Sequence, residues 1–196
     1  MKRLACSLLL AVCAVIPALG APLAVTVTDA AGKPVEGAVV TVSVGGAAKV
    51  AAPGTTAQMA QQNRQFVPQI LVVQAGTSVS FPNRDTVRHH VYSFSPIKRF
   101  ELKLYAGTPS EPVVFDKVGI AVLGCNIHDQ MSAWVVVVDT PYFGKTDAAG
   151  QVQIDVPEGE HRLHAWHPVR AELATPVERA VRAGTPVTVR LGAAPT

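Results

Sequence analysis

Residues 124–131 read GCNIHDQM, and they place the thiol of Cys125, the imidazole of His128 and the thioether of Met131 in one short segment. Apolar runs rich in β-branched residues flank this segment on both sides, a pattern typical of two buried strands joined by a loop. A short loop between strands can present several side chains toward one point. The spacing therefore predicts a ligand-bearing loop within a β-sheet.

A second supply of imidazole lies upstream, where the pair His89-His90 opens the apolar run Val91–Phe94. One thiolate, two imidazoles and one thioether form the ligand set of a mononuclear type 1 copper site. Soft sulfur suits Cu(I), whereas imidazole nitrogen also suits Cu(II), so this set serves both oxidation states and favours single-electron transfer. One histidine of the pair is expected to complete the site from a neighbouring strand.

The cysteine count supports a metal site at Cys125. Of the three cysteines in the chain, Cys6 and Cys13 lie in an N-terminal segment with a basic start, a short apolar run and small residues up to Gly20. These features predict a cleaved signal peptide at residues 1–20. Cys125 then remains alone in an exported protein and cannot form an internal disulfide. An inert buried thiol is the alternative, but the nearby His and Met favour metal ligation.

Charge and hydropathy indicate neither a nucleic-acid partner nor a membrane span in the mature chain. The formal net charge of +3 falls to +1 without residues 1–20, because that segment carries Lys2 and Arg3 and no acidic residue. A nearly neutral chain does not indicate a nucleic-acid partner. No run in the mature chain is long and apolar enough to span a membrane. We therefore expect a periplasmic protein of a Gram-negative bacterium.

Short runs of alternating hydrophobicity, separated by Gly, Pro, Asn and Asp, predict an all-β chain. Residues 45–56 are expected to form a linker and residues 57–65 a short helical turn. Strands this short at regular spacing favour β-sandwiches. The expected strands are 23–28, 38–44, 70–73, 78–81, 90–94, 100–105, 113–115, 120–123, 134–138, 151–156, 162–166, 177–181 and 187–191.

Residues 59–139 resemble the cupredoxin family, in particular its amicyanin and plastocyanin members. The resemblance rests on two motifs, residues 83–91 (NRDTVRHHV) and the Cys-x-x-His-x-x-Met spacing of residues 125–131. It implies a Greek-key β-sandwich that binds one type 1 copper ion. The ligands that it implies are His89, Cys125, His128 and Met131.

Two further residues, which do not bind the metal themselves, are expected to hold these ligands in place. In the family, the residue after the ligand histidine ties the two ligand loops together, and His90 occupies that place here. Asn126 follows the ligand cysteine and is the second expected support. A shift of one residue in strand register would exchange His89 and His90, because neighbouring side chains point to opposite faces.

The chain departs from the amicyanin pattern within the ligand loop. Asn126, Asp129 and Gln130 occupy positions where those proteins often carry proline or apolar residues. The resemblance therefore does not carry over the redox potential or the apolar docking patch of the family. The chain also resembles bacterial proteins labelled methylamine utilization or plastocyanin-like, a label that concerns gene neighbourhood and says little about mechanism.

The two flanks, residues 21–58 and 140–196, together resemble a carboxypeptidase-regulatory-like, transthyretin-like β-sandwich. The segment TDAAG occurs in both, at residues 28–32 and 146–150. The resemblance implies one discontinuous module into which the cupredoxin segment is inserted. The alternative is a cupredoxin followed by a separate small module.

These features predict a periplasmic protein that transfers single electrons between redox partners, for example a cytochrome c or a dehydrogenase. Copper delivery or sequestration is the alternative, because the same soft ligands hold Cu(I). A third reading is a binding module on a degenerate cupredoxin scaffold, which the complete set of four ligand types disfavours. We do not expect an enzyme, because the sequence offers no ligand set for a second copper with an open position.

Overall fold

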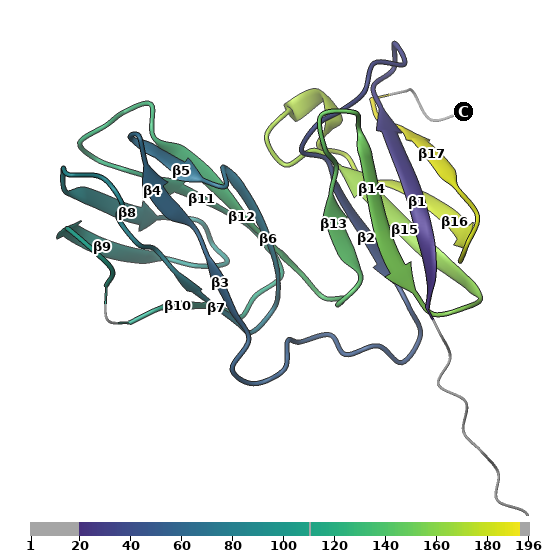
Figure 1. The fold of residues 1–196 in the computed structure, drawn as a ribbon, viewed down its shortest axis with the longest axis horizontal. Coiled ribbons are helices and arrows are strands. Elements are labelled where there is room, and N and C mark those ends of the chain that lie inside the picture. Colours follow the sequence, from purple (N-terminus) through teal and green to yellow (C-terminus); the bar gives the residue numbers. More distant parts are fainter. Residues whose placement is uncertain (1–19, 110, 193–196) are drawn as a thin grey trace, which may run out of the picture.

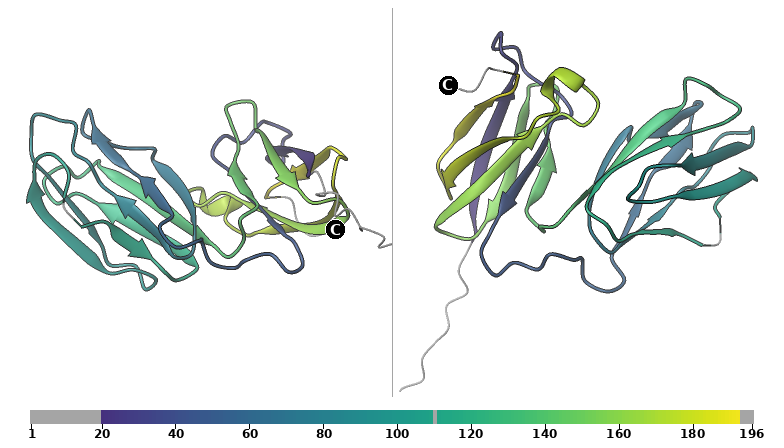
Figure 2. Two further views of the ribbon diagram at one scale, coloured as in Figure 1. Left: turned by 60° about the horizontal axis from the view of Figure 1, so that its bottom comes forward. Right: turned by 180° about the vertical axis from the view of Figure 1, so that it is seen from behind.

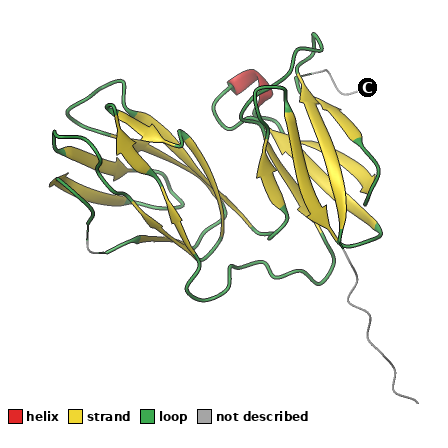
Figure 3. Ribbon diagram, viewed as in Figure 1, coloured by secondary structure: helices red, strands yellow, loops and turns green. Residues whose placement is uncertain are grey.

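The computed structural model describes residues 20–109 and 111–192, and this part of the chain is all-β (Figures 1 and 3). Apart from the short 3-10 helix η1 (Ala171–Leu173), the described residues form strands and connecting loops. No helix among them is long and apolar enough to cross a membrane. The all-β prediction is confirmed. The predicted signal peptide at residues 1–20 lies almost wholly outside the described residues.

The middle of the chain forms one lobe, here called the site lobe, from β3 to β12 (Figure 1). Its larger sheet has the order β6-β12-β11-β8-β9, and its smaller sheet the order β10-β7-β3, with a separate hairpin β4-β5. The strand bounds are β3 (Thr56–Gln58), β4 (Ala60–Gln62), β5 (Gln65–Val67), β6 (Ile70–Gln74), β7 (Thr77–Ser80), β8 (His89–Ser93), β9 (Phe100–Tyr105), β10 (Val113–Phe115), β11 (Gly119–Gly124) and β12 (Ser132–Val138).

Strand alternation builds the core of the site lobe. Along β11, Ala121 and Leu123 point inward while Val122 is exposed, as the two-residue period of a strand requires. The same period carries on past the end of β11, so that Cys125 also points inward and is only 4 % exposed. The thiol therefore lies at one end of a hydrophobic core.

Both ends of the chain build the other lobe, here called the flank lobe (Figure 2). One sheet has the order β14-β1-β17 and the other β13-β2-β15-β16, so strands from before and after the site lobe lie side by side. The strand bounds are β1 (Ala21–Thr28), β2 (Val39–Ser43), β13 (Phe143–Lys145), β14 (Gln151–Val156), β15 (Glu160–Trp166), β16 (Val177–Arg182) and β17 (Val187–Arg190).

The repeated TDAAG segment forms the same turn twice in the flank lobe. Asp29 Oδ1 accepts hydrogen bonds from the backbone N–H groups of Ala31 and Lys33, at 3.0 and 2.9 Å. Asp147 Oδ1 accepts the equivalent pair from Ala149 and Gln151, at 2.9 and 2.8 Å. An Asp side chain that captures nearby N–H groups stabilises a tight turn, which explains why the pattern recurs where β1 and β14 pair.

The lobes meet through a small apolar cluster of their own. Val39 from the flank lobe packs with Ile70, Val136 and Val138 from the site lobe. The Lys145 ammonium donates a hydrogen bond of 3.1 Å to the carbonyl oxygen of Ile70. These contacts lie along β6 and β12, away from the end of β11 that carries Cys125.

Residues 56–67 differ from their sequence prediction. A helical turn was expected for residues 57–65, but β3, β4 and β5 occupy this region. Thr56–Gln58 pairs in parallel with Ser78–Ser80 of β7, which places β3 in the site lobe, upstream of residue 59 where the cupredoxin-like segment was expected to begin. Pairing with a neighbouring strand overrides the weak local preference of a short polar segment.

Candidate metal centre

Cys125 directly follows β11 and lies at the start of the loop that joins β11 to β12. Its thiol belongs to no disulfide and is buried among apolar neighbours of the site-lobe core. A thiol in such surroundings is inert unless positive charge or a metal stabilises the thiolate. The side chains that face it therefore decide what this residue can do.

Two imidazoles face the thiol from different elements. His89, at the start of β8, is completely buried, and its Nδ1 lies 4.0 Å from Cys125 Sγ. His128, in the β11–β12 loop, places its Nδ1 3.7 Å from the same sulfur and is only partly buried. The two rings lie 5.0 Å apart between centroids. Among the described residues, these three form the one group of His, Cys, Asp or Glu side chains whose ligand atoms all converge within 4.8 Å.

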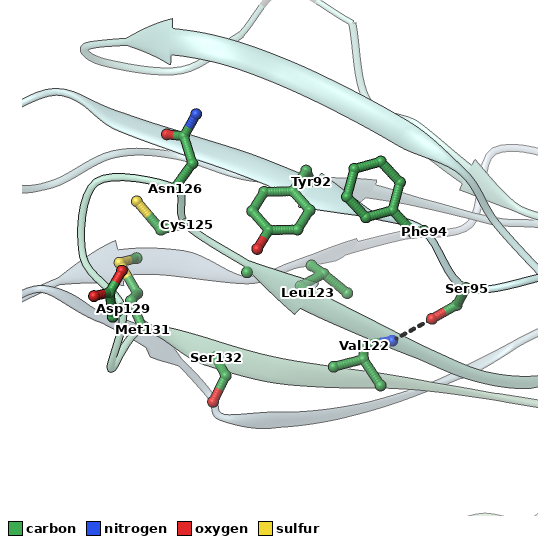
Figure 4. Close-up of a pocket in the computed structure, with 11 residues that line it drawn as sticks. Tyr92, Phe94, Ser95, Val122, Leu123, Cys125, Asn126, Asp129, Met131 and Ser132 are labelled. Carbon is green, nitrogen blue, oxygen red and sulfur yellow. Dashed lines mark hydrogen bonds between the residues drawn. The ribbon is translucent and has the colours of Figure 1, made fainter.

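Met131 closes the loop just before β12 begins. Its backbone N–H donates a 2.9 Å hydrogen bond to the carbonyl oxygen of His128, and its side chain is only 2 % exposed. Cys125 and Met131 line the same pocket, and Figure 4 shows their side chains at the loop end of this pocket. The structure therefore gathers all four predicted ligand residues at one end of the site lobe.

The spacing of the donor atoms fits a bound metal ion. With a metal–thiolate bond of about 2.3 Å and a metal–imidazole bond of about 2.0 Å, a trigonal arrangement separates sulfur and nitrogen by about 3.7 Å. The separations to His128 and His89 are 3.7 and 4.0 Å. A thiolate and two imidazoles in a plane, with a thioether as a fourth, weaker donor, is a set that suits copper.

Asp85, for which the sequence predicted no role, supports His89 on the side away from the thiol. Its Oδ2 lies 2.8 Å from Nε2 of His89. An ionised carboxylate can only accept a hydrogen bond, so Nε2 carries a proton, and in the neutral imidazole Nδ1 then keeps a free electron pair toward Cys125. The one signal in the sequence was an acidic residue four positions before the histidine pair.

The same carboxylate accepts two more hydrogen bonds. The backbone N–H groups of Asn63 and Arg64 donate to its two oxygens, at 2.7 and 2.9 Å. Burial acts to raise the pKa of Asp85, but the hydrogen bonds from Arg64, His89 and Asn63 together hold the pKa below its usual value. The group is therefore ionised at neutral pH, as its role as an acceptor requires.

Among the described residues, the side chains of His90 and Asn126, the two expected supports, form no hydrogen bond to a candidate ligand. His90 points to the other face of β8, toward the ring of Tyr92, with a centroid distance of 5.6 Å. Its Nε2 lies 3.0 Å from a carboxylate oxygen of Glu101 on β9 without the alignment of a hydrogen bond. Asn126 is exposed and lines the pocket beside Cys125. Of the three residues, Asp85 alone forms a side-chain hydrogen bond to a candidate ligand, His89.

Tyr92 covers the segment just before Cys125. It pairs with Gly124 across β8 and β11, and a Cβ atom at Gly124 would lie only 2.7 Å from the Tyr92 hydroxyl oxygen. A side chain at residue 124 and the ring of Tyr92 therefore cannot occupy the same space. The ring of Tyr92 in turn packs at a tilt against the ring of Phe94, which is 75 % exposed, at a centroid distance of 5.2 Å. Figure 4 shows both rings along the pocket that leads to Cys125.

No family model matches the chain, and no curated protein matches it. Solved structures that resemble it include a purple cupredoxin from Nitrosopumilus maritimus, with 22 % identity, a TM-score of 0.37, and coverage of 41 % of this chain and 98 % of the other. Amicyanin from Paracoccus versutus has 17 % identity, a TM-score of 0.37, and coverage of 50 % and 96 %. The copper-containing nitrite reductase of Thermus scotoductus has 25 % identity, a TM-score of 0.40, and coverage of 50 % and 25 %.

Proposed function

We propose that this chain is a type 1 copper protein that transfers single electrons between exported redox partners. The copper ligands are His89, Cys125, His128 and Met131. The observation that carries the proposal is the convergence of two imidazole Nδ1 atoms on one buried, unpaired thiol, at 4.0 and 3.7 Å. A main-chain partner would satisfy a merely structural histidine, whereas these two nitrogens face sulfur.

Each ligand has its own place relative to the protein surface. His89 lies in the core, at the start of a strand, and Asp85 holds its ring. His128 lies closest to solvent, next to the exposed Ile127, so it is the proposed port through which electrons enter and leave. Cys125 would provide the strongest electronic coupling to a bound copper ion, and Met131 would supply a fourth, weaker donor. Bound copper supplies the one-electron couple, and the protein keeps the ligand geometry nearly constant between the two states.

The proposal also covers location, partners and the flank lobe. A cleaved segment at residues 1–20 would export the chain to the periplasm. Redox proteins such as a cytochrome c or a dehydrogenase are the proposed partners. The flank lobe, formed by strands from residues 21–43 and 143–190, is proposed to be a transthyretin-like scaffold. Its described part contains no group of side chains that converges like the one at Cys125.

The decisive experiment is a visible spectrum of the mature protein after loading with Cu(II), before and after ascorbate. We expect an intense band near about 600 nm from the thiolate–copper bond, and bleaching by the reductant. Cys125→Ser should abolish this band, whereas Met131→Gln should retain the band at a shifted wavelength and change the potential. A band of full intensity in Cys125→Ser would refute the site.

The same measurement separates electron transfer from copper delivery. Tight Cu(I) binding without an intense Cu(II) band would support a carrier, because a carrier needs soft ligands but no stable oxidised state. Absence of copper binding in either state would contradict both functions. A reversible potential measured in solution, together with a band that bleaches fully, would support electron transfer.

A further inference from the structure

The contacts of Asp85 join the β4–β5 turn to the segment 83–89, which carries the candidate ligand His89. Its carboxylate binds the β4–β5 turn through the N–H groups of Asn63 and Arg64, and it binds the ring of His89 through Nε2. The backbone N–H of Asp85 donates a hydrogen bond of 2.9 Å to the side-chain oxygen of the buried Asn83. Both the position and the orientation of the carboxylate are therefore fixed from several sides.

The turn that Asp85 binds has an unusual backbone. Asn63 and Arg64 have φ values of 55° and 56°, which non-glycine residues rarely adopt. Two consecutive residues with positive φ form the type I′ turn of a two-residue hairpin. In this turn both central N–H groups point toward the same side, where the Asp85 carboxylate receives them. The two backbone amides and the imidazole all donate hydrogen bonds to the same carboxylate. An ionised Asp fits this arrangement because both of its oxygens accept.

We infer that Asp85 is a positioning residue that fixes the Nε2–H tautomer and the ring orientation of His89, and so favours the oxidised state of the metal. This inference rests on the proposed copper site. A carboxylate that accepts a hydrogen bond from a ligand imidazole makes the imidazole a stronger electron donor. A stronger donor stabilises Cu(II) more than Cu(I), because Cu(I) prefers soft sulfur. Asp85 therefore lowers the reduction potential.

The first test uses the metal-free protein and nuclear magnetic resonance. Long-range proton–nitrogen correlations distinguish a protonated from an unprotonated imidazole nitrogen. In the native chain we expect His89 in the Nε2–H form, with a slowly exchanging proton. In Asp85→Ala we expect a mixture of tautomers and at least about tenfold faster exchange of that proton, because its acceptor is lost.

The second test measures the potential and the affinities for Cu(II) and Cu(I). Loss of a group that supports a metal ligand typically weakens metal binding by about 10- to 100-fold. We expect Asp85→Ala to weaken Cu(II) binding about tenfold more than Cu(I) binding, which corresponds to a rise in potential of about 59 mV. If Asp85→Ala fails to fold, Asp85→Asn replaces it. Asp85→Asn keeps one acceptor oxygen, so we expect a smaller rise in the same direction.

Two control variants separate positioning from general destabilisation. Asp147→Ala removes a carboxylate that binds two turn N–H groups in the flank lobe and contacts no histidine. Asn63→Gly relaxes the β4–β5 turn, since glycine adopts positive φ without strain, and leaves Asp85 in place. We expect neither control to change the tautomer of His89 or the potential.

The outcomes also distinguish this inference from the proposed function. An unchanged tautomer and potential in Asp85→Ala would overturn the inference, as would an equal shift in Asp147→Ala. In both cases the native protein would still bind copper and show its visible band. If the native protein binds no copper, the proposed function fails, and with it the role of Asp85 in setting the potential. The tautomer measurement would then still report whether Asp85 orients His89.

Discussion

Two buried histidines, one in each lobe, have opposite hydrogen-bonding surroundings. In the flank lobe, His167 Nε2 lies 3.2 Å from the carbonyl oxygen of Glu36, and its Nδ1 accepts N–H groups from Val169 and Arg170 at 3.2 and 3.0 Å. Both ring nitrogens therefore have main-chain partners. In the site lobe, His89 uses one nitrogen for Asp85 and turns the other toward a thiol.

This difference distinguishes a buried histidine that stabilises the fold from one that is a candidate metal ligand. A buried polar group is normally satisfied by the chain, because an unpaired one costs about 1–3 kcal/mol. Thr140 and Thr146 of the flank lobe follow this rule, with hydroxyl groups that donate to main-chain carbonyls at 2.7 and 2.6 Å. At the end of the site lobe, the Nδ1 atoms of His89 and His128 face the sulfur of Cys125 and not the main chain. We therefore expect the flank lobe to be stable by itself and the site lobe to gain stability from the proposed metal.

The largest expected effect is a loss of stability in the flank lobe that leaves the site intact. Leu163 is completely buried in the core of that lobe, and Leu163→Ala should lower the free energy of unfolding by about 2–5 kcal/mol. Urea denaturation followed by circular dichroism measures this loss. We expect the visible spectrum of the folded copper form to stay unchanged. A shifted band would contradict the independence of the two cores.

Copper should stabilise the site lobe selectively. A ligand at 100 times its dissociation constant adds about 2.7 kcal/mol to the folded state that binds it. Hydrogen exchange of the amides in β11 and β12 should then slow about 100-fold where exchange requires global opening of the site lobe. We expect a much smaller change in β14 and β15. Equal slowing in both lobes would show that they unfold as a single unit.

The close packing of Tyr92 on Gly124 predicts a smaller effect, confined to the site lobe. A Cβ at Gly124 would meet the Tyr92 ring at 2.7–2.8 Å, so Gly124→Ala should cost about 1–3 kcal/mol and displace the ring. The matched control is Gly45→Ala, where a Cβ would contact nothing within 4 Å. Denaturation curves and the copper spectrum check both variants. A spectral shift is expected in Gly124→Ala alone.

The smallest expected effect concerns the dependence of stability on pH at His167. Burial lowers the pKa of this imidazole below its ordinary value of 6.5, although the hydrogen bond to Glu36 partly opposes the shift. As the pH falls, His167 therefore takes up a proton in the unfolded chain before it does so in the folded chain. The contribution of neutral His167 to the free energy of unfolding is complete above pH 6.5. This contribution is lost as the pH falls from 6.5 through the lower folded-state pKa. The free energy of unfolding of the native chain and of His167→Asn, compared from pH 7.5 to pH 5, should show that difference. Parallel curves would contradict it.

The sequence by itself determined the local features. Alternating hydrophobicity identified most strands, because one buried face imposes a two-residue period. The spacing of Cys125, His128 and Met131 predicted three of the four candidate ligands, since a short loop must keep these three side chains near one another. The two TDAAG segments form equivalent turns for an equally local reason, as each Asp captures N–H groups two and four residues ahead.

Tertiary structure alone decided which side chains meet across the chain. His89 faces the thiol, and the buried His90 faces the opposite side of β8, because of the register in which β8 pairs with β9 and β11, including an irregularity between His89 and Val91. The role of Asp85 depends on a turn 21–22 residues upstream and a ring four residues downstream. No local pattern encodes the contact with the turn, because it arises only when separate strands pack into one lobe.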